Sequence, residues 1–335
     1  MKKRVVIAGN LIVDIIKRIE VYPEKNMLAT VTKISKSVGG CVPNVAIDLK
    51  RLEPSLDIAA YGKVGADEEG DFLLGELKKN GIDTAHIKRD ALGTSFTDVM
   101  TEQSGARTFF QYRGANASFS PEDIDLEGLD CDLFHIGYAL LLDSMDEEDK
   151  EYGTKMARLL HDVQSRGIKT SLDVVSETSA RFKKIVAPAV AYCDYVVLNE
   201  SEAGLVAQIE PRNGDGSINL KALESILKKF LSYGVREKVV IHCPEVGVSM
   251  RAGQSVMTVV PSLKLPQGYI KGTVGAGDAF CAGILYSALC GKGDGEALEI
   301  AACAAAANLA VADSVSGAVS AAEALKLKEL YGRRA

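Results

Sequence analysis

Long apolar runs are missing from this chain of 335 residues. A helix that spans a bilayer needs roughly 20 consecutive apolar residues, and no stretch of the sequence approaches that length. The amino-terminal segment MKKRVVIAGN has a basic flank, but the apolar run behind it, residues 5–9, is shorter than the apolar region of a secretory signal. We therefore expect no membrane partner and no leader, and we interpret residues 5–9 as a first buried β-strand.

Paired cysteines are missing as well. The seven cysteines are scattered, odd in number and form no Cys-x-x-Cys pair. This spacing argues against a disulfide framework and against a zinc site, and it is typical of free thiols in a reducing compartment. The sequence thus favours a cytoplasmic location.

A long basic block is the third absence. The net charge is −6 at pH 7, and the hydrophobic and charged shares, 47% and 25%, are ordinary for a globular protein. This charge argues against nucleic acid as the main partner, although it leaves room for a local basic pocket that binds a phosphorylated ligand. Repeats and long linkers are absent too, so the length suits one large domain with an accessory piece, or two domains.

The chain does contain a regular alternation of short apolar runs and amphipathic helical segments. Buried strands are predicted at residues 5–9, 57–62, 133–137, 170–175, 195–199 and 239–243. Helical patterns lie between them, for example at 67–81 and 148–167, and both of these end in glycine. The alternation predicts an α/β fold with a mainly parallel sheet and helices on both faces, in which ligands bind beyond the carboxyl ends of the strands.

Two stretches interrupt this rhythm. Residues 15–37 lack helical periodicity, and residues 94–119 resemble two strands around a Ser-Gly turn. We expect them to form antiparallel ribbons that meet as a small β lid over the substrate. The large domain would then comprise residues 1–14, 38–93 and 120–335. The alternative is a surface ornament without a function.

Residues 272–280, GTVGAGDAF, are the most informative stretch. A Gly-Ala-Gly turn exposes backbone N–H groups, and it leads directly into an apolar helical segment whose amino terminus carries a partial positive charge. The pattern predicts an anion cradle with the Asp278 carboxylate set into it. Such a cradle suits a migrating phosphoryl group while Asp278 takes a proton from an attacking hydroxyl. The simpler alternative is that Asp278 only caps the helix.

A second glycine-rich turn precedes a helix at residues 38–52, VGGCVPNVAIDLKRL. Gly39 and Gly40 let a ligand hydroxyl approach bare backbone N–H groups, and Asn44 can both donate and accept hydrogen bonds. Taken alone, a Gly-Gly pair is usually only a turn. Its combination with GTVGAGD makes the pattern specific.

With these motifs the chain resembles the ribokinase-like, or PfkB, family of carbohydrate kinases over nearly its whole length. The matching segments are GNLIVD at 9–14, VGGCVPNVA at 38–46, residues 62–83, GANASFSPEDI at 114–124, LNESEA at 198–203 and TVGAGDAFCAG at 273–283. The resemblance implies a three-layer αβα sandwich with a mainly parallel central sheet and a small β-sheet lid. It also implies ATP-dependent transfer of the γ-phosphoryl group to a sugar hydroxyl, with a nucleoside kinase of the same fold as the alternative.

The resemblance assigns a role to each matching residue. Asp278 would be the general base, and the backbone N–H groups of Gly275, Ala276 and Gly277 would form the anion hole. The sugar hydroxyls would be bound by Asp14, Gly39, Gly40 and Asn44. Asn199 and Glu202 would orient Mg²⁺ through its waters, since Mg²⁺ keeps most of them. The nucleotide would contact Asn199, Thr273, Gly247 in a glycine turn, Asn308 and Gly317. A structural role for Asn199 as the end of a turn remains the alternative.

The chain departs from the commonest family pattern in three places. Gly272 stands where many members have an aspartate that helps to bind a monovalent cation, so potassium activation is left open. After the strand at 170–175 only Asp173 matches the usual Asp-Pro-Asn. The segment HCPEVGV at 242–248 has lost the earlier glycine of the nucleotide-side turn, which leaves the nucleotide preference open as well.

The acceptor remains undecided at this level. The GAN segment at 114–116 favours a ribose-like sugar. Arg107 and Arg113 on the lid suit a carboxylate or phosphate, as in a sugar acid or sugar phosphate, or else they are solvated strand charges. The lid aromatics suit a nucleoside base or the core of the lid itself. These aromatics are Phe109, Phe110, Tyr112 and Phe119.

Two other classes of protein fit the sequence less well than a kinase. A binding protein without catalysis is disfavoured because Asp278, Asn199 and Glu202 are all present. A dinucleotide-dependent oxidoreductase is disfavoured because the glycines lie near the carboxyl terminus and do not open a first βαβ unit. The lid also favours a homodimer, since an exposed small sheet buries its apolar face well against a second copy.

Overall fold

A nine-stranded sheet forms the centre of the computed structural model, which describes residues 3–177 and 181–334. The strand order is β15-β14-β13-β12-β11-β8-β1-β4-β5. The strands are β1 Arg4–Gly9, β4 Asp57–Gly65, β5 Asp83–Asp90, β8 Leu133–Ala139, β11 Lys169–Val174, β12 Tyr195–Asn199, β13 Lys238–His242, β14 Val246–Arg251 and β15 Thr258–Pro261. The run from β13 to β5 is parallel, and β14 and β15 are antiparallel additions at one edge.

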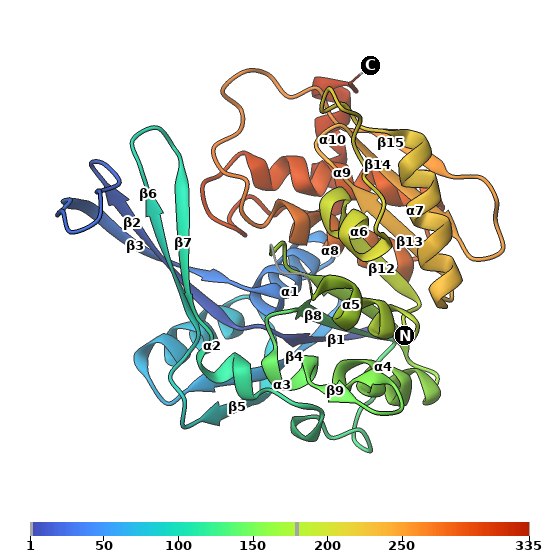
Figure 1. Cartoon of the computed structure of the whole chain (residues 1–335), viewed down its shortest axis with the longest axis horizontal. Coiled ribbons are helices and arrows are strands. Elements are labelled where there is room, and N and C mark those ends of the chain that lie inside the picture. The colour runs from blue at the N-terminus through green and yellow to red at the C-terminus, as the bar shows by residue number, and fades with distance from the viewer. Residues whose placement is uncertain (1–2, 178–180, 335) are drawn as a thin grey trace.

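Helices cover both faces of this sheet (Figure 1). One face carries α1 Cys41–Leu52, α2 Glu68–Lys79, α8 Ala276–Leu289 and α9 Asp294–Leu309, with α10 Ala321–Tyr331 packed on α9. The other carries α4 Lys155–Ser165, α5 Phe182–Val190, α6 Glu200–Ala207 and α7 Leu220–Tyr233. Each face buries its own hydrophobic core against apolar strands, because parallel strands covered on both sides must be apolar throughout. The predicted three-layer αβα sandwich is confirmed.

Short elements connect these layers. They are α3 Asp143–Asp146, the small hairpin of β9 Glu148–Asp149 and β10 Gly153–Thr154, and the 3-10 turns η1 Gly114–Ser118 and η2 Pro121–Asp123. Within the part of the chain that the structure describes, every helix is too short or too polar to cross a bilayer.

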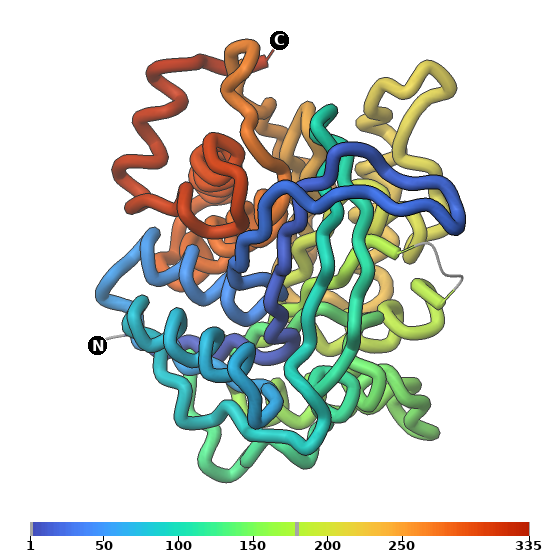
Figure 2. Tube along the Cα trace, turned by 90° about the vertical axis from the view of Figure 1, so that its left-hand side faces the viewer, coloured from blue at the N-terminus to red at the C-terminus, as the bar shows by residue number. Residues whose placement is uncertain are grey.

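The second, smaller sheet has the order β3-β2-β6-β7. Its strands are β2 Ile12–Ile19, β3 Val31–Gly39, β6 Phe96–Thr101 and β7 Arg107–Tyr112. The two hairpins are antiparallel internally, and β2 pairs with β6 in parallel, so segments far apart in the sequence form one sheet. Figure 2 looks onto this sheet, where the blue β2–β3 hairpin crosses the teal β6–β7 hairpin in front of the main body. The expectation of a small separate sheet is confirmed.

The lid sheet differs in detail from the segments predicted for it. Its first hairpin, β2 and β3, begins at Ile12 rather than residue 15 and ends at Gly39 rather than residue 37. Residues 114–118, predicted as part of the lid, form η1 against β4 of the main body. Pattern alone placed these boundaries a few residues off, because β2 and β3 continue into the core where their apolar side chains are buried.

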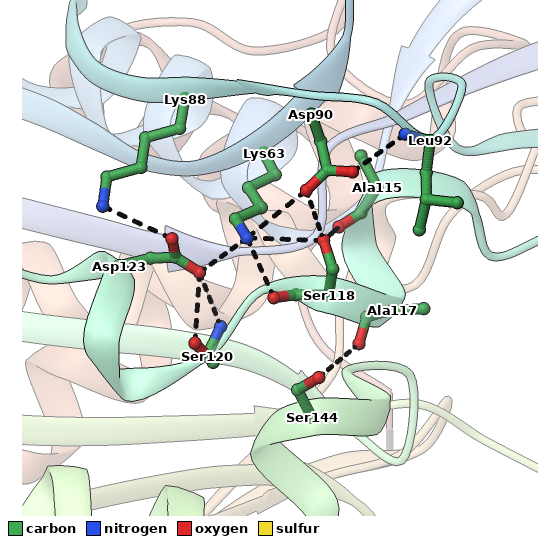
Figure 3. Close-up of polar contacts among 10 residues, drawn as sticks. All are labelled: Lys63, Lys88, Asp90, Leu92, Ala115, Ala117, Ser118, Ser120, Asp123 and Ser144. Carbon is green, nitrogen blue, oxygen red and sulfur yellow. Dashed lines mark hydrogen bonds and ion pairs between the residues drawn. The ribbon is translucent and has the colours of Figure 1, made fainter.

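A buried lysine anchors the segment that follows the lid (Figure 3). The Lys63 ammonium, with its side chain only 13% exposed, lies 2.9 Å from Asp123 Oδ2 and 3.4 Å from Asp90 Oδ2. It also donates to the backbone carbonyl of Ser118 at 3.0 Å. A buried charge is stable only with such partners. The cluster therefore fixes residues 114–123, and with them the base of the lid, to the main domain.

Candidate active site

A cavity of about 620 Å³ lies between the lid and the carboxyl ends of the strands. Among the predicted site residues it is lined by Asp14, Gly40, Asn44, Arg113, Asn199, Glu202, Gly275, Gly277 and Asp278. Tyr138, Asp173, Asn199 and His242 reach it from the ends of β8, β11, β12 and β13. This is the edge at which open parallel sheets bind ligands.

A second cavity of about 530 Å³ adjoins the first. Predicted residues in its wall are Asn199, Thr273, Ala276 and Gly277. The two cavities share Ser176, Asn199, His242 and Gly277. The GAGD turn thus separates one cavity under the lid from a second cavity against α9, and residues of the turn line both cavities.

The turn itself requires glycine. Gly275 precedes α8 with φ of 78°, and a Cβ there would lie 2.4 Å from the carbonyl oxygen of Ser314. At Gly277 a Cβ would meet only the His242 ring, at 3.6 Å, which is an ordinary van der Waals contact, so the requirement for glycine lies at Gly275. The first N–H groups of a helix have no acceptor within that helix. In the 14-residue α8, the N–H of Ala276 has a long 3.4 Å contact with the Thr273 carbonyl, and the first-turn residues line the junction of the two cavities at the positive end of the helix dipole.

Asp278 points away from the helix end and into the site. Gly275 makes no side-chain cap, and the Asp278 carboxylate instead accepts hydrogen bonds from the Tyr138 hydroxyl at 2.7 Å and from Asn44 Nδ2 at 2.9 Å. Asp278 is 7% exposed. Burial raises the pKa of Asp278 to about 6, although the two hydrogen bonds act in the opposite direction. The contacts therefore favour a chemical role over the simple helix cap.

Asn44 and Asp14 are two further polar residues in the wall of the cavity under the lid. Asn44 is 3% exposed, and its Oδ1 has no hydrogen-bond partner among the described residues, so it is free to accept from a ligand hydroxyl. A Cβ on Gly39 would lie 2.5 Å from the Asp14 carboxylate, and Gly40 precedes α1 with φ of 86°. Burial, with the charge of Asp278, raises the pKa of Asp14 to about 7. Gly39 itself lines neither cavity, and its lack of a side chain leaves room for the Asp14 carboxylate.

Asn199 and Glu202 combine a structural contact with exposure to the cavity. They form a capping box at the start of α6, in which Asn199 Oδ1 accepts from Glu202 N at 2.9 Å and Glu202 Oε2 accepts from Asn199 N at 3.0 Å. Ser176 Oγ donates to Glu202 Oε1 at 2.6 Å. Burial raises the pKa of Glu202 to about 7. A divalent cation would favour the ionised carboxylate, and one carboxylate with one amide suits Mg²⁺, which keeps most of its waters.

Three predicted nucleotide residues lie outside the walls of both cavities. Gly247 is inside strand β14, where its Cα packs toward Phe280 and Leu298, and the turn is made by residues 243–245. The predicted glycine turn at Gly247 is therefore wrong, because the strand begins one residue earlier. Asn308 is buried in α9 and donates to the carbonyl of Ser314. Gly317 packs its backbone against Asn308, so both support the loop after α9.

The GAN segment has a structural role in this fold. Asn116 is fully buried, its Oδ1 accepts from the backbone N–H of Leu11 at 3.1 Å, and its Nδ2 donates to the Leu11 carbonyl at 3.1 Å. None of residues 114–118 lines the cavity. Phe119 is buried in the core, and of the suggested aromatics only Phe109 reaches the cavity wall. The segment thus gives no evidence for a ribose-like acceptor.

Sequence reasoning missed Tyr138 and His242 and gave Asp173 no defined role. Tyr138 directly follows a run that was predicted as a buried strand, and this position beyond a strand end is the signal that points to it. Burial and the charge of Asp278 hold the pKa of Asp173 well above its usual range. Burial lowers the pKa of His242 to about 4, so its ring is neutral and offers a hydrogen bond rather than a charge.

Comparison with known proteins agrees with this geometry. The model of the pfkB family of carbohydrate kinases matches residues 2–318. Ribokinase from Schizosaccharomyces pombe is 22% identical over 310 residues, which cover 89% of this chain and 89% of that protein. The 5-dehydro-2-deoxygluconokinase of Geobacillus thermodenitrificans is 25% identical over 293 residues, which cover 83% of this chain and 80% of that protein.

The same fold is found in the structure of Arabidopsis thaliana ribokinase complexed with ribose and ATP. Its TM-score is 0.78 at 20% identity, and the alignment covers 98% of this chain and 99% of that one. That likeness shows the fold, while the family match shows the kind of reaction. Because the match extends over nearly the whole length, this chain belongs to the pfkB family of carbohydrate kinases, which are phosphotransferases with an alcohol group as acceptor.

Proposed function

We propose that this protein transfers the γ-phosphoryl group of ATP to a hydroxyl of a sugar or sugar acid held under the lid. One observation carries the proposal: the buried Asp278 carboxylate and the first turn of α8 lie where the two cavities meet. The lid-side cavity is the acceptor site and the other is the nucleotide site. Thr273 and Ala276 belong to the wall of the second.

The chemistry follows from what these groups can do. Asp278 takes the proton of the acceptor hydroxyl while the oxygen of that hydroxyl bonds to the γ-phosphorus. At the same time the bond between the γ-phosphorus and the leaving oxygen of ADP breaks. Backbone N–H groups of Gly275, Ala276 and Gly277 stabilise the charge on the transferring group. Asn199 and Glu202 would hold Mg²⁺ through its waters, and Mg²⁺ supplies charge neutralisation on the phosphates.

The second cavity has the character of a site for a nucleotide base. Its wall is largely apolar and includes Phe280, Ala302, Ala305, Ala306 and Leu309. Such a wall suits the flat face of adenine, while the polar end at Asn199 and Thr273 lies toward the phosphates. Asn308 and Gly317 act behind this wall by fixing the loop after α9.

Potassium activation is not part of the proposal. A Cβ on Gly272 would lie 2.8 Å from the carbonyl oxygens of Val311 and Ala312. The space that an aspartate side chain would need beside these carbonyls is therefore taken by backbone.

The acceptor cavity combines hydroxyl-binding groups with a cation. Asp14, Asn44, Thr97 and Gln111 offer donors and acceptors. Arg113 lies at the wall, where its Nη1 is bonded to the Leu140 carbonyl at 2.9 Å and lies 3.7 Å from Oδ1 of Asp143. The remaining guanidinium N–H groups suit a carboxylate, which favours a sugar acid over a neutral sugar. The relative named 5-dehydro-2-deoxygluconokinase is consistent with such an acceptor.

An assay of ADP release across an acceptor panel tests the proposal. The panel contains pentoses, hexoses, sugar acids, sugar phosphates and nucleosides, each with Mg²⁺ and ATP. We expect acceptor-dependent ADP release that is strongest with a sugar acid. A preference for nucleosides would support the alternative kinase, for which Phe109 is the aromatic group at the wall. ADP release that no acceptor stimulates would contradict the proposed function.

We also propose a homodimer formed through the lid. Phe109, Gln111 and Arg113 line the cavity, so strand alternation directs Phe110 and Tyr112 to the opposite, outer face. The residues that pair across the sheet in register place Ile34 on that outer face as well. Ile34, Phe110 and Tyr112 are 61%, 50% and 44% exposed. A second copy is the partner that best covers such an apolar face.

A further inference from the structure

A second cluster of chemically active side chains lies behind the floor of the acceptor cavity. It consists of His135 on β8, Asp173 on β11 and Cys281 on α8, and all three are buried. One ligand atom of each lies within 4.8 Å of the others. Asp173 also lines the acceptor cavity, so the cluster is connected to the site by one of its own members.

Cys41 lies beside this cluster. Its Sγ lies 3.4 Å from His135 Nε2, and both residues are fully buried. The set of mutually close ligand atoms nevertheless comprises only His135, Asp173 and Cys281, so Cys41 is a neighbour of the cluster and not one of its ligands. Gly137 leaves the space open, because a Cβ there would lie 2.8 Å from Cys41 Sγ and 3.1 Å from Asp173 Cβ.

The types of ligand point to a thiophilic metal rather than Mg²⁺. Thiol, imidazole and carboxylate groups together are the zinc ligand set, whereas Mg²⁺ takes oxygen ligands. A hydrogen bond on the other side of the ring also orients His135, since its Nδ1 lies 3.1 Å from Ser171 Oγ. A hydrogen bond to the far nitrogen is the usual support of a metal-binding histidine, and it directs Nε2 toward the thiol.

We propose that His135, Asp173 and Cys281 bind one Zn²⁺ ion, and that this ion inhibits phosphoryl transfer. Binding would release the thiol proton of Cys281 to solvent as the zinc–sulfur bond forms, with no change of oxidation state. It would draw the Asp173 carboxylate out of the acceptor cavity. Cys281 lies one helical turn after Asp278, so the ion would also restrain the start of α8.

Sequence patterns do not reveal this site, because its ligands are scattered along the chain. No pair of them has zinc-ligand spacing. The pairing of β8 with β11 and the position of α8 against the sheet bring His135, Asp173 and Cys281 together, and the packing of α1 on α8 places Cys41 beside them. The expectation of no zinc site rested on spacing alone, which detects only sites made by neighbouring residues.

Co²⁺ provides the test of binding, because a tetrahedral cobalt–thiolate site has characteristic visible absorption and a sulfur-to-metal charge-transfer band. The full-length protein is titrated with Co²⁺ without oxygen and with a thiol-free reductant. We expect one bound ion per chain with this spectrum, displaced by Zn²⁺. The spectrum should be lost in Cys281→Ser and in Cys281→Ala, and retained in Cys193→Ser, a buried cysteine on the other face of the sheet. Wild-type protein without the thiolate band, or a band that persists in both Cys281 variants, would overturn the proposed site.

Inhibition is tested separately and rests on the proposed kinase function. Zn²⁺ added to the ADP-release assay should lower the turnover of the wild type and of Cys193→Ser much more than that of Cys281→Ala. Equal inhibition of all three would refute the inhibitory role, since Zn²⁺ would then act elsewhere, for example on the nucleotide. If no acceptor supports turnover, the kinase proposal fails, and the cobalt spectrum still decides the metal site.

Discussion

The Tyr138 hydroxyl donates a 2.7 Å hydrogen bond to Oδ1 of Asp278. With Asn44 bonded to Oδ2 at 2.9 Å, both oxygens of the proposed base are fixed by side chains from different elements, β8 and α1. Donors of this kind stabilise the ionised carboxylate. They counteract burial, which alone would raise the pKa of Asp278 above its value of about 6. Tyr138 is therefore a positioning residue that keeps the base ionised near neutral pH.

Tyr138→Phe should move the pH dependence of kcat/KM. Activity requires ionised Asp278, so it should fall as the pH decreases through about 6 in the wild type. Loss of the hydrogen bond raises the pKa of Asp278 and shifts this acidic limb to higher pH. A hydrogen bond to a charged group contributes about 1.5 kcal/mol or more, which corresponds to roughly one pH unit. pH–rate profiles measure the shift, with Tyr152→Phe as the control, because Tyr152 lines neither cavity. An unchanged limb would contradict the role of Tyr138.

Asp278→Asn should abolish most turnover while leaving ligand binding largely intact. The amide keeps the shape of the side chain but cannot take a proton, and loss of a general base typically lowers kcat by at least ~10²-fold. Steady-state ADP release measures the loss, and calorimetric titration with nucleotide and with acceptor measures binding. Turnover close to that of the wild type would show that another group, or water, removes the proton.

Arg113 should distinguish acidic acceptors from neutral ones. Arg113→Gln removes the charge at the cavity wall, so kcat/KM should fall for sugar acids by a factor of ~10 or more and change little for neutral sugars, in line with the strength of a charge-assisted hydrogen bond. Arg113→Lys is the matched variant, because it keeps the charge and loses the bidentate geometry. Equal losses for both acceptor classes would show that Arg113 supports the lid and does not recognise a carboxylate.

Local patterns were sufficient for the residues whose role follows from their own backbone. Gly275 in the GAGD turn and Gly40 have positive φ, and a glycine directly before a predicted helix indicates such a conformation at both positions. Asp14 was assigned by the resemblance to the family, and the structure places it within β2, at the third residue of the strand, and not at the end of a strand as expected. Tyr138 was not, because its contact with Asp278 spans 140 positions and depends on the order of β8 and on the packing of α8. No pattern within one segment carries that information.

The exact boundaries of helices and strands were the second feature that the sequence pattern could not predict. Gly247 was expected in a turn, yet the strand begins at Val246, and this shift of one or two residues moves the glycine from the ligand to the interior. Boundaries of elements are the least certain product of pattern reasoning. Asn116 shows the same limit for a whole segment, since only the tertiary structure reveals that Leu11 takes both of its hydrogen bonds.

A charged residue on the outer face of the lid should separate the proposed dimer. Ile34 and Phe110 lie on that face and are 61% and 50% exposed, so Ile34→Glu with Phe110→Glu places two carboxylates where apolar side chains would meet those of a second copy. An unpaired charge buried in an interface costs several kcal/mol, enough to shift the equilibrium toward monomer at micromolar concentration. Sedimentation equilibrium measures the mass of the wild type, which we expect to be that of a dimer.

The control for this experiment is Leu330→Glu on α10, an exposed apolar residue away from the lid, at 68% exposure. It should leave the mass unchanged. Because neither Ile34 nor Phe110 lines the acceptor cavity, a monomeric double variant with reduced affinity for acceptor would further show that the second copy holds the lid in place. A wild type that sediments as a monomer, or a double variant that stays dimeric, would reject the lid as the interface.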